Sequence, residues 1–269
     1  MLTELHPPSL GSGTRAPDPD RRPHAVVIGS GFGGLAAAIR LGARGYRVTV
    51  LETLDQPGGR ARVFRQDGFT FDAGPTIVTA PFLFEELWAL CGRRMEDDVR
   101  LTALDPFYRL IFDDGSSLDC SGDVEAMRAR IAAFAPGDVA GYGGFLKAAE
   151  AIFKVGFEQL ADVPFSTLVD MLKALPAMAR LRADRSVYGL AAHHVRDERL
   201  RTALSFHPLF IGGSPFSATA IYALVLHLER KFGVHFAHGG TGALVQGLVG
   251  LLEGQGATLR YGATVAEIT

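Results

Sequence analysis

The sequence has few cysteines and no excess of charge of either sign. Two cysteines occur in 269 residues, Cys91 and Cys120, which excludes a disulfide-stabilised scaffold. Nothing around them resembles a metal site, so we expect two free thiols and no metal. Lysine and arginine number 27 against 29 aspartate and glutamate, a net charge of −2 at pH 7. This balance leaves no broad basic surface for nucleic acid, and we expect no nucleic-acid partner.

Long apolar runs are also missing. The longest stretch without a formal charge, residues 202–228, is interrupted by Pro208, Gly212 and Pro215. A membrane-spanning helix needs about 20 mostly apolar residues with a fully paired backbone, so this stretch is not predicted to cross a bilayer. Residues 1–23 are rich in proline and charge and lack the apolar core of a secretory signal. We interpret them as a disordered leader.

The first clear pattern in the sequence is a β-α-β unit near its start. Residues 24–28 form a short apolar run, which is typical of a buried parallel strand. A glycine turn and a helical pattern cover residues 29–44, and Gly45 ends the helix. Residues 47–52 alternate as a second strand. A strand, a turn, a helix and a strand within about 30 residues predict an α/β fold class.

The turn of this unit carries the GxGxxG pattern, Gly29-Ser30-Gly31-Phe32-Gly33-Gly34. Gly29 permits the sharp turn, Gly31 lets a pyrophosphate approach the backbone, and Gly34 lets the helix pack on the strand. The pyrophosphate then lies at the helix N-terminus, where free N–H groups favour negative charge. Glu52 ends the second strand, near the offset of about 20 residues expected for the acid that binds ribose hydroxyls. Together these features predict a dinucleotide site.

A second glycine-rich segment follows Glu52, with the sequence Gln56-Pro57-Gly58-Gly59-Arg60-Ala61. Its two glycines expose backbone donors, and the guanidinium of Arg60 can bind a phosphate. We therefore predict a second anion-binding segment immediately after the β-α-β unit.

Hairpins and helices are expected along the rest of the chain. Strand-like pairs that flank Asp-Gly turns predict two β-hairpins, residues 61–65 with 69–71 and residues 108–112 with 117–120. Residues 124–204 have a helical pattern with proline breaks. A further helix is predicted over residues 242–252, and strands over residues 258–261 and 263–268.

Taken together, these segments resemble the flavin amine oxidase superfamily. The residues that carry the resemblance are 26–34, Glu52, 58–60 and 71–75. Other stretches are similar to the bacterial-type phytoene desaturases of carotenoid synthesis: residues 106–110, 185–188, 212–216, 221–222, 228–230 and 236–247. The resemblance runs from about residue 25 to the last residue. It departs from the family in the leader and in the absence of the family's C-terminal half, so we interpret the chain as an N-terminal fragment.

The resemblance implies a Rossmann-like FAD-binding domain of the glutathione-reductase type, with an inserted mixed α+β domain that faces the substrate and the membrane. We assign residues 24–80 and 229–269 to an incomplete FAD-binding domain and residues 81–228 to a largely helical substrate-binding domain. The cofactor-binding residues that the resemblance implies are Gly29, Gly31, Phe32, Gly33, Gly34, Glu52, Gly59, Arg60, Ala61, Asp72, Gly74 and Pro75.

The implied activity is that of an FAD-dependent oxidoreductase that introduces double bonds into phytoene, towards neurosporene or lycopene. A hydrocarbon C–H bond has no usable acidity, so hydride transfer to the flavin is followed by loss of a proton from the next carbon. Quinone or oxygen would accept the electrons. The alternatives are a desaturase of a hydroxylated or methoxylated carotenoid or of diapophytoene, an amine or protoporphyrinogen oxidase, and a non-enzymatic isoprenoid-binding protein on the same fold.

The helical region offers one candidate acid and one candidate membrane surface. Asp170 lies among apolar residues and could accept the proton, or it could face solvent on an amphipathic helix. An apolar stripe with basic residues nearby has the composition of an interfacial helix, or of a helix that faces the core. It comprises Phe153, Val155, Phe157, Leu160, Leu168, Met171, Leu172, Leu175 and Met178. Because phytoene resides in the bilayer, we expect a cytoplasmic protein peripherally associated with the membrane. Residues 206–228 would suit the wall of a hydrocarbon tunnel.

Overall fold

The computed structural model describes residues 21–72, 74–161, 163–164 and 166–269, and the chain divides into two compact units. The sheet unit comprises the described residues 21–103 and 235–269. The helical unit comprises the described residues 104–234. Most of the leader predicted for residues 1–23 lies outside the described residues.

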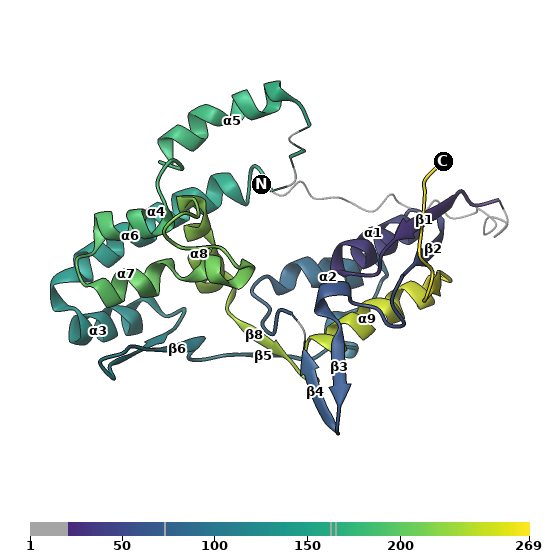
Figure 1. The fold of residues 1–269 in the computed structure, drawn as a ribbon, viewed down its shortest axis with the longest axis horizontal. Helices are drawn as coiled ribbons and strands as arrows, with labels where there is room; N and C mark the ends of the chain where they lie inside the picture. Colours follow the sequence, from purple (N-terminus) through teal and green to yellow (C-terminus); the bar gives the residue numbers. More distant parts are fainter. Residues whose placement is uncertain (1–20, 73, 162, 165) are drawn as a thin grey trace. The chain divides into compact units, whose positions relative to one another are not determined.

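Three parallel strands form the centre of the sheet unit, in the order β1-β2-β9 (Figure 1). β1 (His24–Ile28) pairs with β2 (Arg47–Leu51), and β2 pairs with β9 (Thr258–Arg260). The chain between β1 and β2 forms α1 (Phe32–Ala43), which confirms the predicted strand-helix-strand order. Gly29 and Gly45, both with positive φ, turn the chain at either end of this connection.

One face of this sheet is buried against helices and the other is exposed. Val48 and Val50 of β2 are buried in one core with α1 and with α9 (Thr241–Gly254). Burial of each such side chain stabilises the fold by about 1.5–3 kcal/mol. Val26 and Ile28 of β1 point to the opposite face and are 53% and 52% exposed. Parallel sheets usually have both faces covered, so the exposed side of β1 is unusual.

The sheet unit extends beyond the boundary predicted after residue 80. α2 (Pro81–Leu90) buries Leu87 and Trp88 in the same core as α1 and α9, and β5 (Leu101–Ala103) pairs with β8 (His235–Ala237). The compact units therefore divide after residues 103 and 234. The assignment of an FAD-binding and a substrate-binding domain stays a prediction.

A hairpin and two short 3₁₀ turns complete the sheet unit. β3 (Val63–Gln66) and β4 (Phe69–Asp72) form the hairpin predicted around Asp67-Gly68. The 3₁₀ turns are η1 (Gly59–Ala61) and η2 (Met95–Asp97). The prediction of a strand over residues 263–268 is wrong, because none of these residues forms part of a strand. The backbone N–H of Ala263 donates instead to the carbonyl of Glu52.

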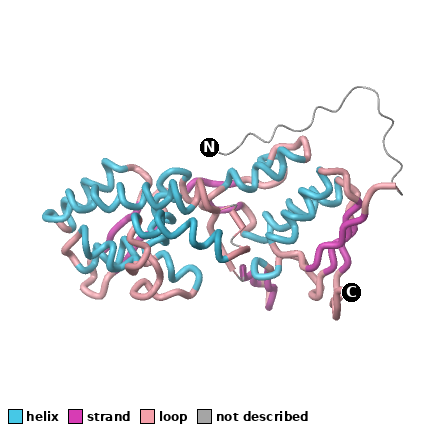
Figure 2. Tube along the Cα trace, turned by 90° about the horizontal axis from the view of Figure 1, so that it is seen from above, coloured by secondary structure: helices cyan, strands magenta, loops and turns pink. Residues whose placement is uncertain are grey.

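The helical unit is mostly α-helix, drawn in cyan in Figure 2. Its elements in chain order are β6 (Tyr108–Ile111), β7 (Ser117–Cys120), α3 (Val124–Phe134), η3 (Pro136–Asp138), α4 (Val139–Gly156), α5 (Leu168–Arg180), α6 (Val187–His194), α7 (Glu198–Ser205), η4 (His207–Ile211), η5 (Ala220–Tyr222) and α8 (Ala223–Phe232). β6 and β7 form the second predicted hairpin. The core contains Ile131 of α3, Phe145 of α4, Val187 of α6 and Leu200 of α7, all fully buried.

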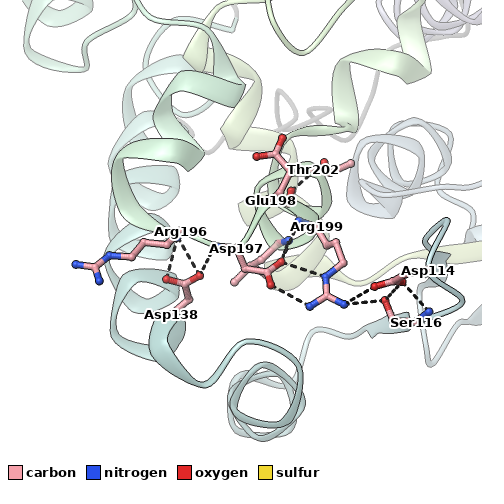
Figure 3. A network of polar contacts seen from close by, with 9 residues as sticks. Asp114, Ser116, Asp138, Arg196, Asp197, Glu198, Arg199 and Thr202 are labelled. Carbon is pink, nitrogen blue, oxygen red and sulfur yellow. Dashed lines mark hydrogen bonds and ion pairs between the residues drawn. The ribbon is translucent and has the colours of Figure 1, made fainter.

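Polar contacts fix the start of α7 in this unit (Figure 3). The carboxylate of Asp138 accepts hydrogen bonds from the backbone N–H groups of Arg196 and Asp197. Asp197 in turn caps α7, and the guanidinium of Arg199 bonds to Asp197 and to Asp114 of the β6–β7 turn. These contacts satisfy N–H groups that a helix start leaves free.

The predicted apolar stripe divides into a buried and an exposed part. Phe153 on α4 is 1% exposed and packs in the core, so a lipid-facing role for it is wrong. On α5, which stands apart from the other helices of its unit in Figure 1, Val169, Leu172 and Leu175 are between 54% and 56% exposed. None of the helices in the described part of the chain has the length and apolarity that crossing a bilayer requires.

Candidate functional site

The glycine turn between β1 and α1 is held by close backbone contacts. Gly29 has φ +90°, and its N–H donates to the carbonyl of Leu51 at 2.7 Å. A Cβ on Gly34 would lie 2.0 Å from the carbonyl oxygen of Gly29, so only glycine fits there. A Cβ on Gly33 would meet nothing within 4 Å. Gly34 therefore brings α1 close to β1, as the spacing of the motif predicts.

The N-terminus of α1 is open to a negatively charged group. Gly31 is the N-cap residue and supplies no side-chain cap, and the first turn contains no acidic side chain. The first N–H groups of a helix have no partner within the helix and carry the positive end of its dipole. This end of α1 can therefore bind a phosphate. Phe32 at the start of α1 packs edge-on against Phe84 of α2, at 5.4 Å between ring centroids, and so also fixes the helix in place.

The carboxylate of Glu52 is buried and hydrogen-bonded at the end of β2. Its Oε2 accepts from the backbone N–H of Ser30 at 2.8 Å and from the Ser30 hydroxyl at 2.6 Å, and its Oε1 accepts from the N–H of Leu54 at 3.0 Å. Burial alone would raise the pKa of Glu52, but the hydrogen bonds from Leu54 and Ser30 outweigh it and lower the pKa. The carboxylate is therefore held in its charged, acceptor form at the end of β2.

The second glycine segment lies directly against the first. The N–H of Gly58 donates to the carbonyl of Ser30 at 2.9 Å, and Gly31 and Gly58 form an isolated parallel bridge. A Cβ on Gly59 would lie 3.3 Å from the Cα of Gly31. The structure thus brings together two segments that the sequence predicted to bind anions. The side chain of Arg60 is exposed and has no ionic partner among the described residues, so it is available to a phosphate.

Asp72, Gly74 and Pro75 contact both the second glycine segment and the start of α9. A Cβ on Gly74 would lie 2.2 Å from the carbonyl oxygen of Arg60. Asp72 accepts a hydrogen bond from the N–H of Thr241 at the start of α9, and the Thr241 hydroxyl donates to the carbonyl of Pro75. The other oxygen of Asp72, Oδ1, is buried and has no hydrogen-bond partner among the described residues. That free acceptor can serve a polar ligand.

Two residues of this region were missed in the list of predicted site residues. Ser30 gives Glu52 two hydrogen bonds, and Thr241 binds both Asp72 and Pro75. A polar residue inside the glycine motif was the available signal for Ser30. Thr241 lies more than 160 positions after Asp72, and no spacing rule links such distant positions.

Asp170 belongs to the helical unit and lies at the start of α5. Its Oδ2 accepts hydrogen bonds from the N–H and hydroxyl of Thr167, and its own N–H donates to the Thr167 hydroxyl. This reciprocal pair is a capping box, which stabilises a helix start. A role for Asp170 in proton transfer stays a prediction. The described residues contain no group of three or more histidine, cysteine or acidic side chains placed to hold a metal.

Comparison with known proteins identifies the family. Residues 32–269 match the family described as flavin containing amine oxidoreductase. The chain belongs to this family. The match confirms the superfamily resemblance seen in the sequence and confirms FAD as the cofactor of the family. A structure of putrescine oxidase bound to putrescine has a similar fold, with a TM-score of 0.52 and 20% identity over 90% of this chain and 51% of that one.

Two curated relatives are closer in sequence. The chain is 52% identical over 253 residues to the neurosporene-forming phytoene desaturase of Cereibacter sphaeroides. The aligned region covers 94% of this chain and 48% of the relative. It is 49% identical over 243 residues to the lycopene-forming phytoene desaturase of Pseudescherichia vulneris. The aligned region covers 90% of this chain and 49% of the relative. The chain thus spans about half the length of the curated relatives it matches.

The residues of the sheet unit fit the FAD of this flavin family. The open N-terminus of α1 suits a pyrophosphate, and the charged carboxylate of Glu52 at the end of β2 suits a ribose hydroxyl. Gly59 has no side chain between its backbone and that of Gly31, so a phosphate can approach the backbone of both residues closely. Asp72 offers a buried free oxygen for another hydroxyl. The individual contacts of these residues with FAD stay predictions.

Proposed function

We propose that this chain contributes the adenine-dinucleotide-binding part of an FAD-dependent carotenoid desaturase that acts on phytoene. The observation that carries the proposal is the 52% identity, over 94% of this chain, to the neurosporene-forming phytoene desaturase. The adjoining glycine segments and the ionised Glu52 support the cofactor part of the proposal. In this proposal, the chain contains a Rossmann-like FAD-binding domain, and a substrate-binding domain is inserted into its sequence.

The chemistry divides between the cofactor and the chain. When bound, FAD supplies a two-electron acceptor for a hydride from an allylic carbon. The chain binds the pyrophosphate at α1, binds the ribose through Glu52, and aligns the hydrocarbon so that water is excluded. A proton must then leave the neighbouring carbon. Both neurosporene-forming and lycopene-forming relatives match, so the number of desaturation steps is left open in the proposal.

Substrate access is proposed to occur from a membrane surface. Phytoene is a hydrocarbon and partitions into the bilayer, so the protein must meet it there. The exposed side chains Val169, Leu172 and Leu175 on α5, with Lys173 and Arg180 on the same helix, have the composition of an interfacial helix. We infer a cytoplasmic protein that associates peripherally with the membrane and passes its electrons to quinone or oxygen.

The experiment that tests the function uses the full-length protein that carries this chain, loaded with FAD and mixed with phytoene in liposomes. We expect the appearance of polyene absorption bands and a product with additional double bonds. Diapophytoene and a hydroxylated carotenoid, supplied in separate liposomes, are the competing substrates. Turnover of either one in preference to phytoene would replace the proposed substrate. FAD binding without turnover of any polyene would contradict the proposal.

A further inference from the structure

Ser30 is a buried polar residue at the centre of the glycine turn in the sheet unit. It lies between Gly29, which turns the chain, and Gly31, which is the N-cap residue of α1. Ser30 is 0% exposed. A fully buried side chain does not touch a ligand that binds from outside. Any influence of Ser30 on a ligand must therefore pass through the groups that it contacts.

Each polar group of Ser30 has a partner within the sheet unit. Its backbone N–H donates to Oε2 of Glu52 at 2.8 Å, and its hydroxyl donates to the same oxygen at 2.6 Å. Its carbonyl accepts from the N–H of Gly58 at 2.9 Å. Ser30 thus links the glycine turn to the end of β2 and to the second glycine segment.

The hydroxyl bond is the part of this contact that depends on the side chain. Its length of 2.6 Å is that of a hydrogen bond from a hydroxyl group to an ionised carboxylate, which is stronger than a bond between neutral groups. Any residue other than proline at position 30 has the backbone N–H. Serine adds a second donor to the same oxygen of Glu52. Replacing Ser30 by alanine therefore removes one donor and leaves the other.

Both oxygens of the Glu52 carboxylate are held by the protein. Ser30 binds Oε2, and the N–H of Leu54 donates to Oε1 at 3.0 Å. Rotation of the carboxylate would break these hydrogen bonds. A group that is already fixed loses little freedom when a ligand binds to it, so fixing it raises the affinity. Ser30 and Leu54 together fix the carboxylate relative to the glycine turn.

The same hydrogen bonds determine the charge of Glu52. Burial raises the pKa of Glu52, but the bonds from Leu54 and from the Ser30 hydroxyl and N–H lower it by more. From β9, Arg260 contacts Glu52 through its carbonyl, which accepts the N–H of Glu52. Burial, Glu253 and Glu52 raise the pKa of Tyr261, which follows β9, so this phenol stays neutral where Glu52 titrates. The ionisation of Glu52 therefore depends on its hydrogen-bond donors.

We propose that Ser30 is a positioning residue for the cofactor, whose hydroxyl holds Glu52 in the orientation and the ionised form that bind the adenosine ribose of FAD. This inference rests on the proposed function, in which Glu52 binds the ribose. The glycines of the GxGxxG motif act through the backbone and shape the turn. Ser30 acts through its side chain, and loss of its hydroxyl should weaken FAD binding while the turn keeps its shape.

The main test measures the affinity of the full-length protein for FAD after removal of the bound flavin. Titration with FAD, followed by the quenching of flavin fluorescence, gives the dissociation constant. We expect Ser30→Ala to bind FAD at least about tenfold more weakly than wild type, because it loses a hydrogen bond to a charged group. Equal affinity would overturn the inference. Tighter binding would also overturn it, because the hydroxyl would then compete with the ribose.

Thr53→Ala is the matched control. Thr53 follows Glu52 directly, and its hydroxyl bonds to the hydroxyl of Thr264 and not to the carboxylate. This variant also loses one hydroxyl group next to Glu52, and its FAD affinity should stay within about threefold of wild type. A loss in Thr53→Ala equal to that in Ser30→Ala would contradict a specific role for Ser30.

An FAD analogue separates positioning of Glu52 from a general effect on the turn. FAD built with 2′,3′-dideoxyadenosine lacks the ribose hydroxyls that Glu52 would bind. Wild type should bind this analogue more weakly than FAD, and Ser30→Ala should bind it as wild type does, because the two losses remove the same interaction. A tenfold difference between wild type and Ser30→Ala for the analogue as well would show a purely structural effect and contradict the inference.

The pH dependence of FAD binding gives a second, independent readout. Since the pKa of Glu52 is lowered, wild-type affinity should be constant down to the ordinary glutamate value of 4.5 and fall below it. Ser30→Ala removes a donor that favours the charged form, so its acid limb should move to higher pH. An unchanged limb would overturn the inference. If Ser30→Ala does not fold, a wild-type limb that lies above pH 4.5 would overturn it instead.

The titrations distinguish failure of this inference from failure of the proposed function. A wild-type protein that binds no FAD contradicts the proposed function. A wild-type protein that binds FAD, with Ser30→Ala binding equally well, refutes only the role of Ser30.

Discussion

The two units use buried carboxylates in opposite ways. In the sheet unit, Glu52 is held by backbone N–H groups of Ser30 and Leu54, next to a turn whose shape is set by glycine. In the helical unit, Glu229 is held by two titratable side chains and keeps one oxygen free. The first arrangement holds a carboxylate with donors from neighbouring backbone, and the second joins side chains from distant parts of the chain. A backbone-defined site leaves a motif in the sequence, and a side-chain-defined site does not.

The largest expected effect comes from breaking the glycine turn of the sheet unit. Gly34→Ala places a Cβ 2.0 Å from the carbonyl oxygen of Gly29, so the turn and α1 must separate. We expect a loss of about 1–3 kcal/mol in the free energy of unfolding, measured by urea denaturation, and at least tenfold weaker FAD binding. Gly33→Ala is the matched control, since its Cβ meets nothing within 4 Å. Equal stability of the two variants would contradict the packing described for α1.

The next effect concerns the charge on Glu52. Glu52→Gln replaces an acceptor of three hydrogen bonds, and we expect it to lower the free energy of unfolding by about 1–3 kcal/mol at pH 7. Because the pKa of Glu52 is lowered in the folded protein, its contribution is full above the ordinary glutamate value of 4.5 and is lost as the pH falls below it. The difference between wild type and variant should therefore shrink in acid.

The control for this titration is Glu253→Gln, an exposed carboxylate of the same unit. Its stability should stay within about 0.5 kcal/mol of wild type at every pH. If Glu52→Gln and Glu253→Gln behave alike, the hydrogen bonds at the end of β2 do not stabilise the charged form.

A smaller effect is expected at the exposed face of α5 in the helical unit. Replacing both Leu172 and Leu175 by Asp removes apolar groups that are exposed and adds negative charge. We expect binding to anionic liposomes, measured by co-sedimentation, to fall at least about tenfold, because each apolar group buried in lipid contributes about 1.5–3 kcal/mol. Ile111→Asp, at 74% exposure on β6 of the same unit, is the matched control. A similar loss in that control would show that charge alone, and not α5, decides binding.

The smallest effect is expected at Asp170. Asp170→Ala removes a capping box from a helix with little packing, so it should cost about 0.5–2 kcal/mol locally and make α5 easier to cleave by protease. If Asp170 acts only as a helix cap, turnover of Asp170→Asn should fall by less than about threefold. A loss of more than about tenfold in Asp170→Asn with α5 still folded would support the predicted role of Asp170 as proton acceptor.

The two units also differ in how much of their structure could be predicted from the sequence. The β-α-β unit and both hairpins were predictable, because glycine spacing and Asp-Gly turns have fixed geometric meaning. The hydrogen bonds from Ser30 to Glu52 were not predicted. The strand over residues 263–268 was predicted wrongly, because a strand also needs a partner that local composition does not reveal.

The burial and the contacts of side chains in the helical unit were harder to predict. Phe153 and Leu172 occur in one apolar stripe, yet only Phe153 is buried, because the packing of α4 against α8 decides which part faces the core. Likewise, Tyr108 and Glu229 are 121 positions apart, and nothing in either local pattern indicates that they meet. Asp170 stood out among apolar neighbours in the sequence, but the structure places it in a capping box.

The most direct measurement is anaerobic mixing of the full-length protein, purified with its FAD, with liposomes that contain phytoene. We expect the visible absorption band of the oxidised flavin to bleach as polyene bands appear, with one double bond formed for each flavin reduced. A protein that binds no flavin even when FAD is added, or a flavin that stays oxidised while phytoene remains unchanged, would contradict it.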